Sequence, residues 1–452
     1  MLKFHKKNEL FLNLKNLLKK KLEEHEKLGI FYIIALVHLI KFIFFSNYRY
    51  NRCLFDPPSK FFYKYKSLTN YFSIPLLIFA KYLKKKNIFI SVNNDCNFSI
   101  GHIFTEITEL KKIQKFDDRY SGSTVWFSSS RKEILNDTKG IFEDKNFRVF
   151  FGGISRVFLT FVAIKCPSIS IDASLGTDNY IFGKKFLSNR IVYHNKSKRR
   201  AKMMIKSQEF YPIKDKLINF QDKKIQLLKD LNIKNKFIVI QMKLDKTNAT
   251  FKILDPEEYL ETINYFKNKN YDIVFAGREI CPKIFLNNEV INYANSKYAT
   301  PLNDYLLVAQ SSFVISSGSG FCNIAEVTDK PILVINSFHG IQQFGRRTIL
   351  LPTLLSINGK SLNPKTQHKY VCTFGQELNN NKFDNLKVAI MASSDDILES
   401  AKELEKMINL PIPPFTPLQK KIHDSKSFPL YADGLSRISD YYLSKHENFF
   451  KQ

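Results

Sequence analysis

Short runs of β-branched and aromatic residues alternate with longer helix-like stretches through most of the chain beyond residue 86. Compact apolar runs bounded by polar or glycine-containing segments are typical of buried strands, whereas apolar positions spaced by three and four residues indicate helices. Because the two kinds of segment alternate, the pattern predicts an α/β fold with mostly parallel sheets.

The first α/β unit is expected over residues 86–225. Its predicted strands are Asn87–Val92, Thr124–Ser128, Arg148–Phe151 and Ser168–Ile171, and its predicted helices are Gly101–Lys115 and Ser130–Lys139. We interpret Ser207–Asp230 as the connection to the next unit.

A second α/β unit is expected over residues 226–410. Its predicted strands are Phe237–Met242, Asp272–Ala276, Phe313–Ser316 and Pro331–Ile335, and its later helices are Leu302–Gln310, Phe321–Val327 and Ser394–Asn409. An earlier helix is expected from Asp255 to about Lys267, with Pro256 in its first turn and Asp255 and Glu258 as a capping box. Such alternation is typical of a nucleotide-binding half. Four prolines then precede a tail, residues 411–452, predicted to be helical around Leu435–Lys445.

The first 85 residues have a different, basic and apolar character. Residues 1–27 predict an amphipathic helix with one leucine face, formed by Leu10, Leu14, Leu17 and Leu18. Leu28–Phe45 is almost wholly apolar, and its 18 residues would span roughly 27 Å as a helix, near the thickness of a bilayer core. Membrane attachment and a buried or interface helix both remain open for it. Tyr71–Leu83 is also apolar, but it is too short to span and contains Pro75.

Composition narrows the class of protein. The 452 residues include 69 Lys and Arg against 42 Asp and Glu, a net charge of +27, with 44% hydrophobic and 25% charged residues. This apolar share excludes wholesale disorder, and a mean hydropathy of −0.23 excludes a polytopic membrane protein. One explanation of the positive charge is a solvated lysine surface that results from A/T-rich codons. The other is binding of anionic lipid, nucleic acid or a phosphate-bearing ligand. The six cysteines form no CxxC pair, which disfavours a zinc site of the usual spacing, and their density is too low for a disulfide framework.

A serine- and glycine-rich loop is the most informative short motif. It joins a predicted strand to a predicted helix and consists of Ser316, Ser317, Gly318, Ser319 and Gly320. Small residues let a ligand approach the backbone closely, and amides at a helix amino-terminus attract anions such as a diphosphate. An ordinary tight strand-to-helix turn is the alternative interpretation.

Basic residues follow several predicted strands of the second unit. Lys243 follows the first strand, and Gly277 and Arg278 follow the second. Arg346 and Arg347 come after the strand at Pro331–Ile335 and its Phe338-His339-Gly340 turn. Ligands of open α/β sheets bind at the carboxyl ends of strands, so we expect these groups to neutralise phosphate there. Solvated basic turns are the alternative.

One histidine of the first unit is a candidate general base. Ser99-Ile100-Gly101-His102 opens a predicted helix, and Glu106 lies one turn further along the same face. A carboxylate in that place can orient an imidazole and raise its basicity. A structural or helix-capping role is the alternative for His102. His194 is a weaker candidate.

Several familiar catalytic motifs are absent from the sequence. It contains no DxD, Walker A, GxSxG or GxGxxG pattern. Without DxD carboxylates to hold a divalent ion on a diphosphate, neutralisation by side chains and helix dipoles is favoured. We therefore expect no metal and no cofactor.

The residues around the serine-glycine loop resemble the donor half of GT-B glycosyltransferases. The similar run is Ile315–Gly320, Phe321–Glu326, Lys330-Pro331 and Asn336. More narrowly, the chain resembles a bacterial family of glycosyltransferases of surface-polysaccharide loci over roughly residues 85–410. That family has an Ile-Gly-His motif, here Ile100-Gly101-His102 with Glu106 and Glu109. Its His-Val-Arg-Asp strand end is here Gln241-Met242-Lys243-Leu244, so Lys243 replaces an arginine and Gln241 a histidine.

The resemblance implies two Rossmann-like domains facing a central cleft, and an inverting transferase. A nucleotide-sugar would bind at Ser316–Gly320 with Lys243, Gly277, Arg278, Glu326 and Arg346 or Arg347. His102 would deprotonate a glycan or lipid-linked acceptor. The amino-terminal region, expected to be helical and membrane-associated, would hold the enzyme on the anionic inner face of the cytoplasmic membrane.

Two other functions compete with this one. A non-catalytic nucleic-acid-binding protein would use the basic surface, for example the dense Lys196–Lys202 patch, but the lysines are spread along the chain and no aromatic-basic RNA motif is present. We therefore expect no nucleic acid partner. A pyruvyltransferase-like enzyme that modifies polysaccharide would differ in its donor.

Overall fold

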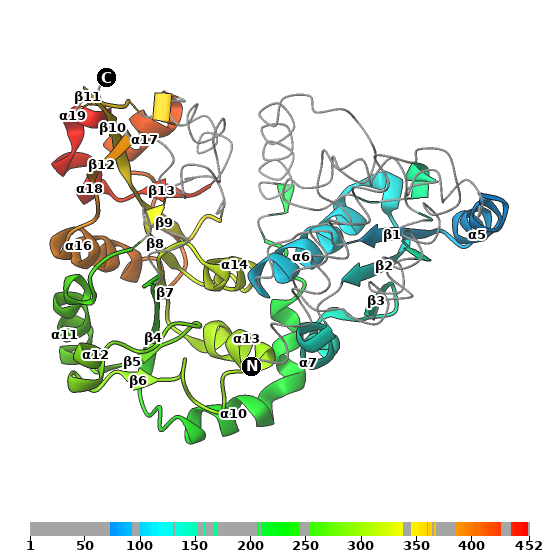
Figure 1. Cartoon of the computed structure of the whole chain (residues 1–452), viewed down its shortest axis with the longest axis horizontal. Helices are drawn as coiled ribbons and strands as arrows, with labels where there is room; N and C mark the ends of the chain where they lie inside the picture. Colours follow the sequence, from blue (N-terminus) through cyan, green and yellow to red (C-terminus); the bar gives the residue numbers. More distant parts are fainter. Residues whose placement is uncertain are drawn as a thin grey trace, which may run out of the picture.

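Two parallel β-sheets form separate halves of the molecule (Figure 1). The computed structural model describes residues 73–92, 100–129, 132–151, 158–159, 162, 166–169, 171, 206–207, 209–244, 253–337, 345–358, 360–363, 366–367, 386–425 and 435–450. The helix predicted over residues 1–27, the Leu28–Phe45 segment and the Lys196–Lys202 patch lie outside these residues. Within the described ranges, no helix is long and apolar enough to cross a membrane.

The smaller sheet has the order β1-β2-β3, and all its described pairs are parallel. Its strands and helices are α5 (Ser73–Lys85), β1 (Ile88–Val92), α6 (Ile100–Phe116), β2 (Thr124–Ser129), α7 (Lys132–Phe142) and β3 (Phe147–Phe151), with short 3-10 turns at Asp118–Tyr120 and Pro167–Ile169. These bounds confirm three of the predicted strands and both predicted helices to within a few residues.

The two faces of the small sheet pack against different partners. Successive side chains of a strand point to opposite faces, and β2 follows this rule. Val125 and Phe127 belong to the large core shared with α6 and α7. Trp126 packs instead with Phe79 of α5 and Phe150, with ring centroids 6.3 and 5.1 Å away. Helix α5 therefore covers the face that points away from the larger sheet.

The larger sheet has the order β13-β9-β8-β7-β4-β5-β6. Its strands are β4 (Lys236–Gln241), β5 (Tyr271–Phe275), β6 (Ile291–Asn292), β7 (Val314–Ser316), β8 (Ile332–Ser337), β9 (Thr348–Pro352) and β13 (Arg437–Ile438). Its helices are α11 (Leu260–Asn268), α12 (Lys283–Asn287), α13 (Pro301–Gln310), α14 (Gly320–Val327) and α16 (Ser394–Glu405). All pairs in it are parallel. Apart from the edge strand β13, the strand order is that of doubly wound nucleotide-binding sheets. In such sheets successive strands are added on one side of the first strand and then on its other side, so the order reverses between the first and fourth strands, here β4 and β7.

The carboxyl-terminal tail adds to this half. It contains α17 (Pro417–Asp424), α18 (Asp440–Lys445) and α19 (Glu447–Phe450), and it returns to pair β13 with β9. A separate antiparallel sheet joins β10 (Leu354–Ile357) to β11 (Lys360–Ser361) and β12 (Leu386–Ile390). In the tail, α18 agrees with the second half of the helix predicted around Leu435–Lys445, but the first half of that prediction was wrong because Arg437–Ile438 forms a strand.

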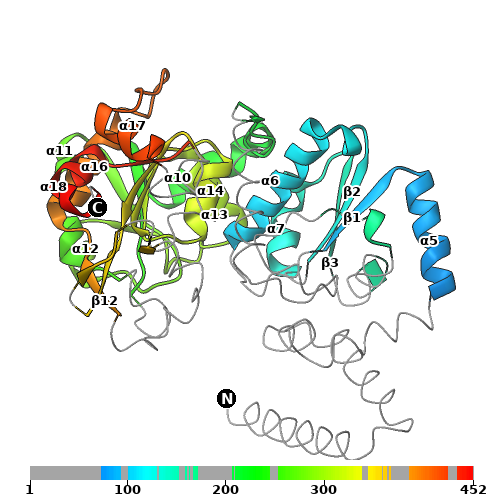
Figure 2. The same cartoon turned by 90° about the horizontal axis from the view of Figure 1, so that it is seen from above.

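Helices from both halves pack together between the two sheets (Figures 1 and 2). Helix α6 packs on α14, and α7 packs on α13. Phe104 of α6 stacks on Tyr305 of α13 with ring centroids 5.4 Å apart. The connection between the halves contains a 3-10 helix at Lys214–Phe220 and α10 (Gln221–Asp230). Its Ile213 carbonyl accepts a hydrogen bond from the Tyr305 hydroxyl at 2.6 Å, so one apolar core continues across both halves.

Two local predictions were wrong. The strand expected at Ser168–Ile171 begins instead as a 3-10 turn at Pro167–Ile169, because Pro167 has a fixed φ that suits a turn and lacks a donor for a sheet. The segment from Pro256 starts as a 3-10 turn without a side-chain cap from Asp255. Glu258 instead accepts a hydrogen bond at 2.6 Å from the Ser394 amide at the start of α16. It caps a helix distant in sequence, which a local pattern does not reveal.

Candidate functional site

The carboxyl ends of β4 and β7 are joined at the point where the strand order reverses. Gln241 and Ser316 are paired residues at these ends. The Ser316 hydroxyl donates to Gln241 Oε1 at 2.7 Å, and the Ser317 amide donates to the Gln241 carbonyl at 3.2 Å. The Gln241 side-chain amide donates to the Met242 carbonyl at 2.7 Å. Gln241 thus fixes the start of the serine-glycine loop.

The serine-glycine loop turns directly into α14. Gly318 has a φ of +67°, a left-handed conformation that glycine adopts without strain. Ser319 is the N-cap residue, and its hydroxyl accepts a hydrogen bond from the Phe321 amide at 3.2 Å. The Ser317 hydroxyl is buried and makes no hydrogen bond to any described residue. A buried donor of this kind costs about 1–3 kcal/mol unless an oxygen pairs with it.

Charged groups lie beside this loop at the ends of β4 and β5. Lys243 Nζ lies 3.9 Å from Glu279 Oε1 and is partly exposed. Gly277 has a φ of +119°, and a β-carbon on it would lie 3.1 Å from Gln241 Cγ, so β5 ends tightly against β4. Arg278 follows and is exposed. The structure therefore brings Lys243, Gly277 and Arg278 to the same edge of the sheet as the loop.

The amino-terminal end of α6 meets the amino-terminal end of α14. A β-carbon on Gly101 would lie 2.3 Å from the Gly320 carbonyl oxygen and 2.5 Å from Gly320 Cα. His102, the next residue, belongs to α6, and its side chain lies outside the described part of the structure. Glu106 is buried one turn further along. The small half thus contacts the candidate site through the motif that contains His102.

A buried acid lies at the start of α13, where sequence reasoning had placed no functional group. The Tyr293 hydroxyl donates to Asp304 Oδ1 at 2.8 Å. Burial raises the pKa of Asp304 to about 6, while the Tyr293 hydrogen bond and the charge of Arg278 act in the opposite direction. Asp137 of α7 accepts a hydrogen bond from the Leu302 amide at 2.6 Å, so a carboxylate from the small half also caps this helix.

Arg346 and Arg347 do not lie at the serine-glycine loop. They precede β9, and the Arg347 carbonyl accepts from the Ile332 amide at the start of β8. In a parallel sheet, strand starts and strand ends lie at opposite edges. Glu326 is also placed away from the loop, because it lies in the last turn of α14, where its Cγ would be 3.4 Å from a β-carbon on Gly345. The structure therefore corrects the expectation that these three residues join the diphosphate site.

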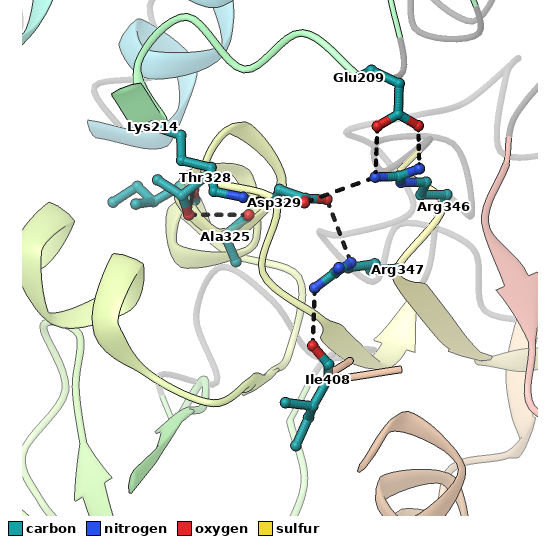
Figure 3. A network of polar contacts seen from close by, with 9 residues as sticks. Glu209, Lys214, Ala325, Thr328, Asp329, Arg346, Arg347 and Ile408 are labelled. Atoms are coloured by element: carbon teal, nitrogen blue, oxygen red, sulfur yellow. Dashed lines mark hydrogen bonds and ion pairs between the residues drawn. The ribbon is translucent and has the colours of Figure 1, made fainter. Parts of the chain in front are cut away.

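The two arginines instead help to hold the connection between the halves, Arg346 directly and Arg347 through Asp329 (Figure 3). Arg346 forms a two-bond ion pair with Glu209, and Arg347 Nε lies 3.5 Å from Asp329 Oδ1. Asp329 Oδ2 also accepts from Lys214 Nζ at 3.4 Å. The position of the two arginines after β8 in the sequence suggested that they lie at the carboxyl end of that strand. Because β9 is parallel to β8, the residues just before β9 lie at the opposite edge of the sheet.

No group of three or more His, Cys, Asp or Glu side chains among the described residues could hold a metal ion. Phe338-His339-Gly340 and His194 lie outside these residues.

Comparisons with known proteins gave only remote likenesses. No protein-family model and no curated protein matches the chain. A glycosyltransferase family 9 protein from Veillonella parvula is 11% identical, with a TM-score of 0.42 over 70% of this chain and 97% of its own. The E. coli ADP-heptose lipopolysaccharide heptosyltransferase II is 10% identical, with a TM-score of 0.41 over 70% of this chain and 98% of its own. S. aureus MnaA with UDP is 11% identical, with a TM-score of 0.27 over 73% of this chain and 99% of its own. Likenesses this distant carry no argument about this chain, so the description of its site rests on its own residues.

Substitution of Gly101 tests the contact between the two helix ends. Gly101→Ala forces α6 away from α14, since the added carbon would overlap backbone atoms that have no flexible side chain to move. We expect a loss of about 1–3 kcal/mol in the free energy of unfolding, measured by chemical denaturation. Gly140→Ala is the matched control, because its added carbon meets only the end of the Phe220 side chain at 3.3 Å. Equal stability of Gly101→Ala and the unchanged protein would contradict the close contact.

The buried acid predicts a specific pH dependence. Between about pH 4 and 6 the folded protein keeps a proton on Asp304 that the unfolded chain has released, so stability from this group is present below pH 4 and is lost as the pH rises through 6. The shift corresponds to about 2–3 kcal/mol. We expect Asp304→Asn to flatten this part of the stability profile measured by denaturation at several pH values. The exposed Asp255→Asn serves as the control, and an unchanged profile in Asp304→Asn would refute the assignment.

Proposed function

We propose that this protein is a glycosyltransferase that moves a sugar from a nucleotide-sugar to a glycan or glycolipid acceptor in surface-polysaccharide synthesis. The observation that carries the proposal is the fixed serine-glycine loop at the strand-order reversal of a doubly wound sheet. Ligands of such sheets bind outside the carboxyl strand ends at this reversal. The same position here combines small residues, an unsatisfied Ser317 hydroxyl and nearby positive charge.

The donor diphosphate would lie on the loop and the amino-terminal end of α14. Backbone amides and the helix dipole attract an anion at that end. Lys243 and Arg278 would stabilise the charge that develops on the departing diphosphate. Lys243 is already held near Glu279 at 3.9 Å, so diphosphate binding would compete with this weak ion pair. We propose that no metal is required, since protein charges perform the neutralisation.

The acceptor would be held by the small half, opposite the donor. His102 would remove the proton from the acceptor hydroxyl as the sugar is transferred with inversion, and Glu106 would orient it. The close contact of Gly101 with Gly320 supports this arrangement, because it brings the His102 segment next to the donor loop. We place the protein at the inner face of the cytoplasmic membrane, attached through its basic amino-terminal region, where lipid-linked acceptors are available.

Nucleotide binding tests the donor site. Among ADP, UDP, GDP and CDP, we expect at least one to raise the melting temperature, because ligand binding to the folded state stabilises it. Lys243→Ala should lower the affinity for that nucleotide about tenfold in calorimetric titration, as expected for loss of one charge-assisted contact.

The matched control is Lys236→Ala, which removes a lysine from the opposite end of the same strand. It should leave the affinity unchanged. The donor site would be disproved if no diphosphate stabilises the protein, or if both lysine variants bind equally well.

A separate variant tests the proposed base. His102→Ala should reduce the transfer rate by about 10²–10⁴-fold while donor affinity stays within twofold of the unchanged protein, roughly one half of a kcal/mol. The readout is the release of nucleoside diphosphate with a glycolipid extract as acceptor, and His423→Ala, in α17, is the control. Full activity of His102→Ala would remove it from the mechanism.

A further inference from the structure

Helix α5 exposes an apolar patch on the side opposite its buried face. Leu76, Ala80 and Leu83 pack inward against the small sheet and are at most 5% exposed. The outward aliphatic residues are Ile74, Leu77 and Ile78, exposed by 70%, 44% and 64%. Large aliphatic side chains gathered in this way on an outer surface mark an interaction site.

Two aromatic residues extend the patch. Tyr82 of α5 is 50% exposed, and Phe158 is 40% exposed. Phe158 packs edge-on against Phe79 with ring centroids 5.0 Å apart, so it belongs to the same surface. Figure 2 shows α5 at the end of the molecule farthest from the larger sheet. The patch is therefore remote from the candidate donor site.

The charge beside the patch has a single sign. Lys81, Lys84, Lys85 and Lys86 are all exposed, and residues 73–86 contain no Asp or Glu. The apolar residues occupy the first half of the outward face and the lysines the second half. A helix with exposed aliphatic and aromatic side chains beside lysines is suited to the boundary between anionic headgroups and acyl chains.

The positive charge of α5 disfavours two other partners for its outward face. In a symmetric contact with a second copy of this chain, the lysines of one α5 would face the lysines or the aliphatic residues of the other, and residues 73–86 supply no carboxylate to pair with them. Residues 1–72 carry 14 Lys and Arg against 5 Asp and Glu, so their net charge has the same sign as that of the lysines on α5. An anionic lipid surface satisfies both the apolar and the basic parts of the face.

We propose that the outward face of α5 docks on a bilayer containing anionic lipids. This contact is additional to any made by residues 1–72, and it rests on the proposed function for its cellular setting. It orients the small half, the proposed acceptor half, toward the membrane. Vesicle binding and nucleotide binding are measured separately, so failure of one does not decide the other.

A local tryptophan reporter tests this surface in the full chain. The protein contains one tryptophan, Trp126, whose signal is subtracted using the unchanged chain. Ile78→Trp places a reporter on the patch, and Ile218→Trp places one on an equally exposed position elsewhere (71%). With vesicles of phosphatidylglycerol and brominated phosphatidylcholine, we expect several-fold stronger quenching of the Ile78→Trp reporter than of the Ile218→Trp reporter.

Equal quenching of the two reporters would overturn the proposal. So would an Ile78→Trp reporter that is blue-shifted without vesicles and unquenched with them, because protein would then cover the patch. Dependence of that shift on protein concentration would identify a second copy, and its absence would identify residues 1–72.

Charge reversal supplies an independent measurement. Lys84→Glu/Lys85→Glu should lower quenching of the Ile78→Trp reporter in anionic vesicles, with at least about tenfold weaker partitioning. The control is Lys223→Glu/Lys229→Glu on the exposed side of α10. All four changes are at exposed positions, and the melting temperature checks that the fold is kept. Equal partitioning of the two double variants would contradict recognition of anionic lipid by α5.

Discussion

The contact between Gly101 and Gly320 is the constraint on which the arrangement of the two halves depends. Side chains are absent from both residues, so the first turn of α6 can meet the first turn of α14 at backbone distance. The stacking of Phe104 on Tyr305 and the capping of α13 by Asp137 continue the same interface. A candidate acceptor motif and a candidate donor loop are thereby held together by packing rather than by a flexible linker.

The direction of the parallel strands then sorts the polar residues into two groups. Gln241 and Ser316 end strands, Lys243 and Gly277 follow strands, and all four share the edge where a ligand can reach helix amino-termini. Arg346 and Arg347 precede a strand and share the other edge with Asp329. The first group is suited to anion binding, and the second holds the interdomain connection. A positive charge alone therefore does not show whether a residue binds an anion or holds the interdomain connection.

Most strands and helices were predictable because apolar periodicity and local turn residues determine them. The same reasoning located the serine-glycine loop, since its small residues stand between an apolar strand and a predicted helix. It failed for Arg346 because it does not show where the chain crosses to the opposite edge of the sheet. It failed for Glu258 and missed Asp304 because their partners, the Ser394 amide and Tyr293, are supplied by other elements.

Hydrogen–deuterium exchange with and without a stabilising nucleoside diphosphate would show at which edge of the large sheet the anion binds, because it reports on both edges at once. We expect slower exchange at the amides of Ser317–Phe321 and Gly277–Glu279, with no change at Gly345–Arg347. Slower exchange confined to Gly345–Arg347 would place the anion at the other edge of the sheet and would rule out the serine-glycine loop as the donor site.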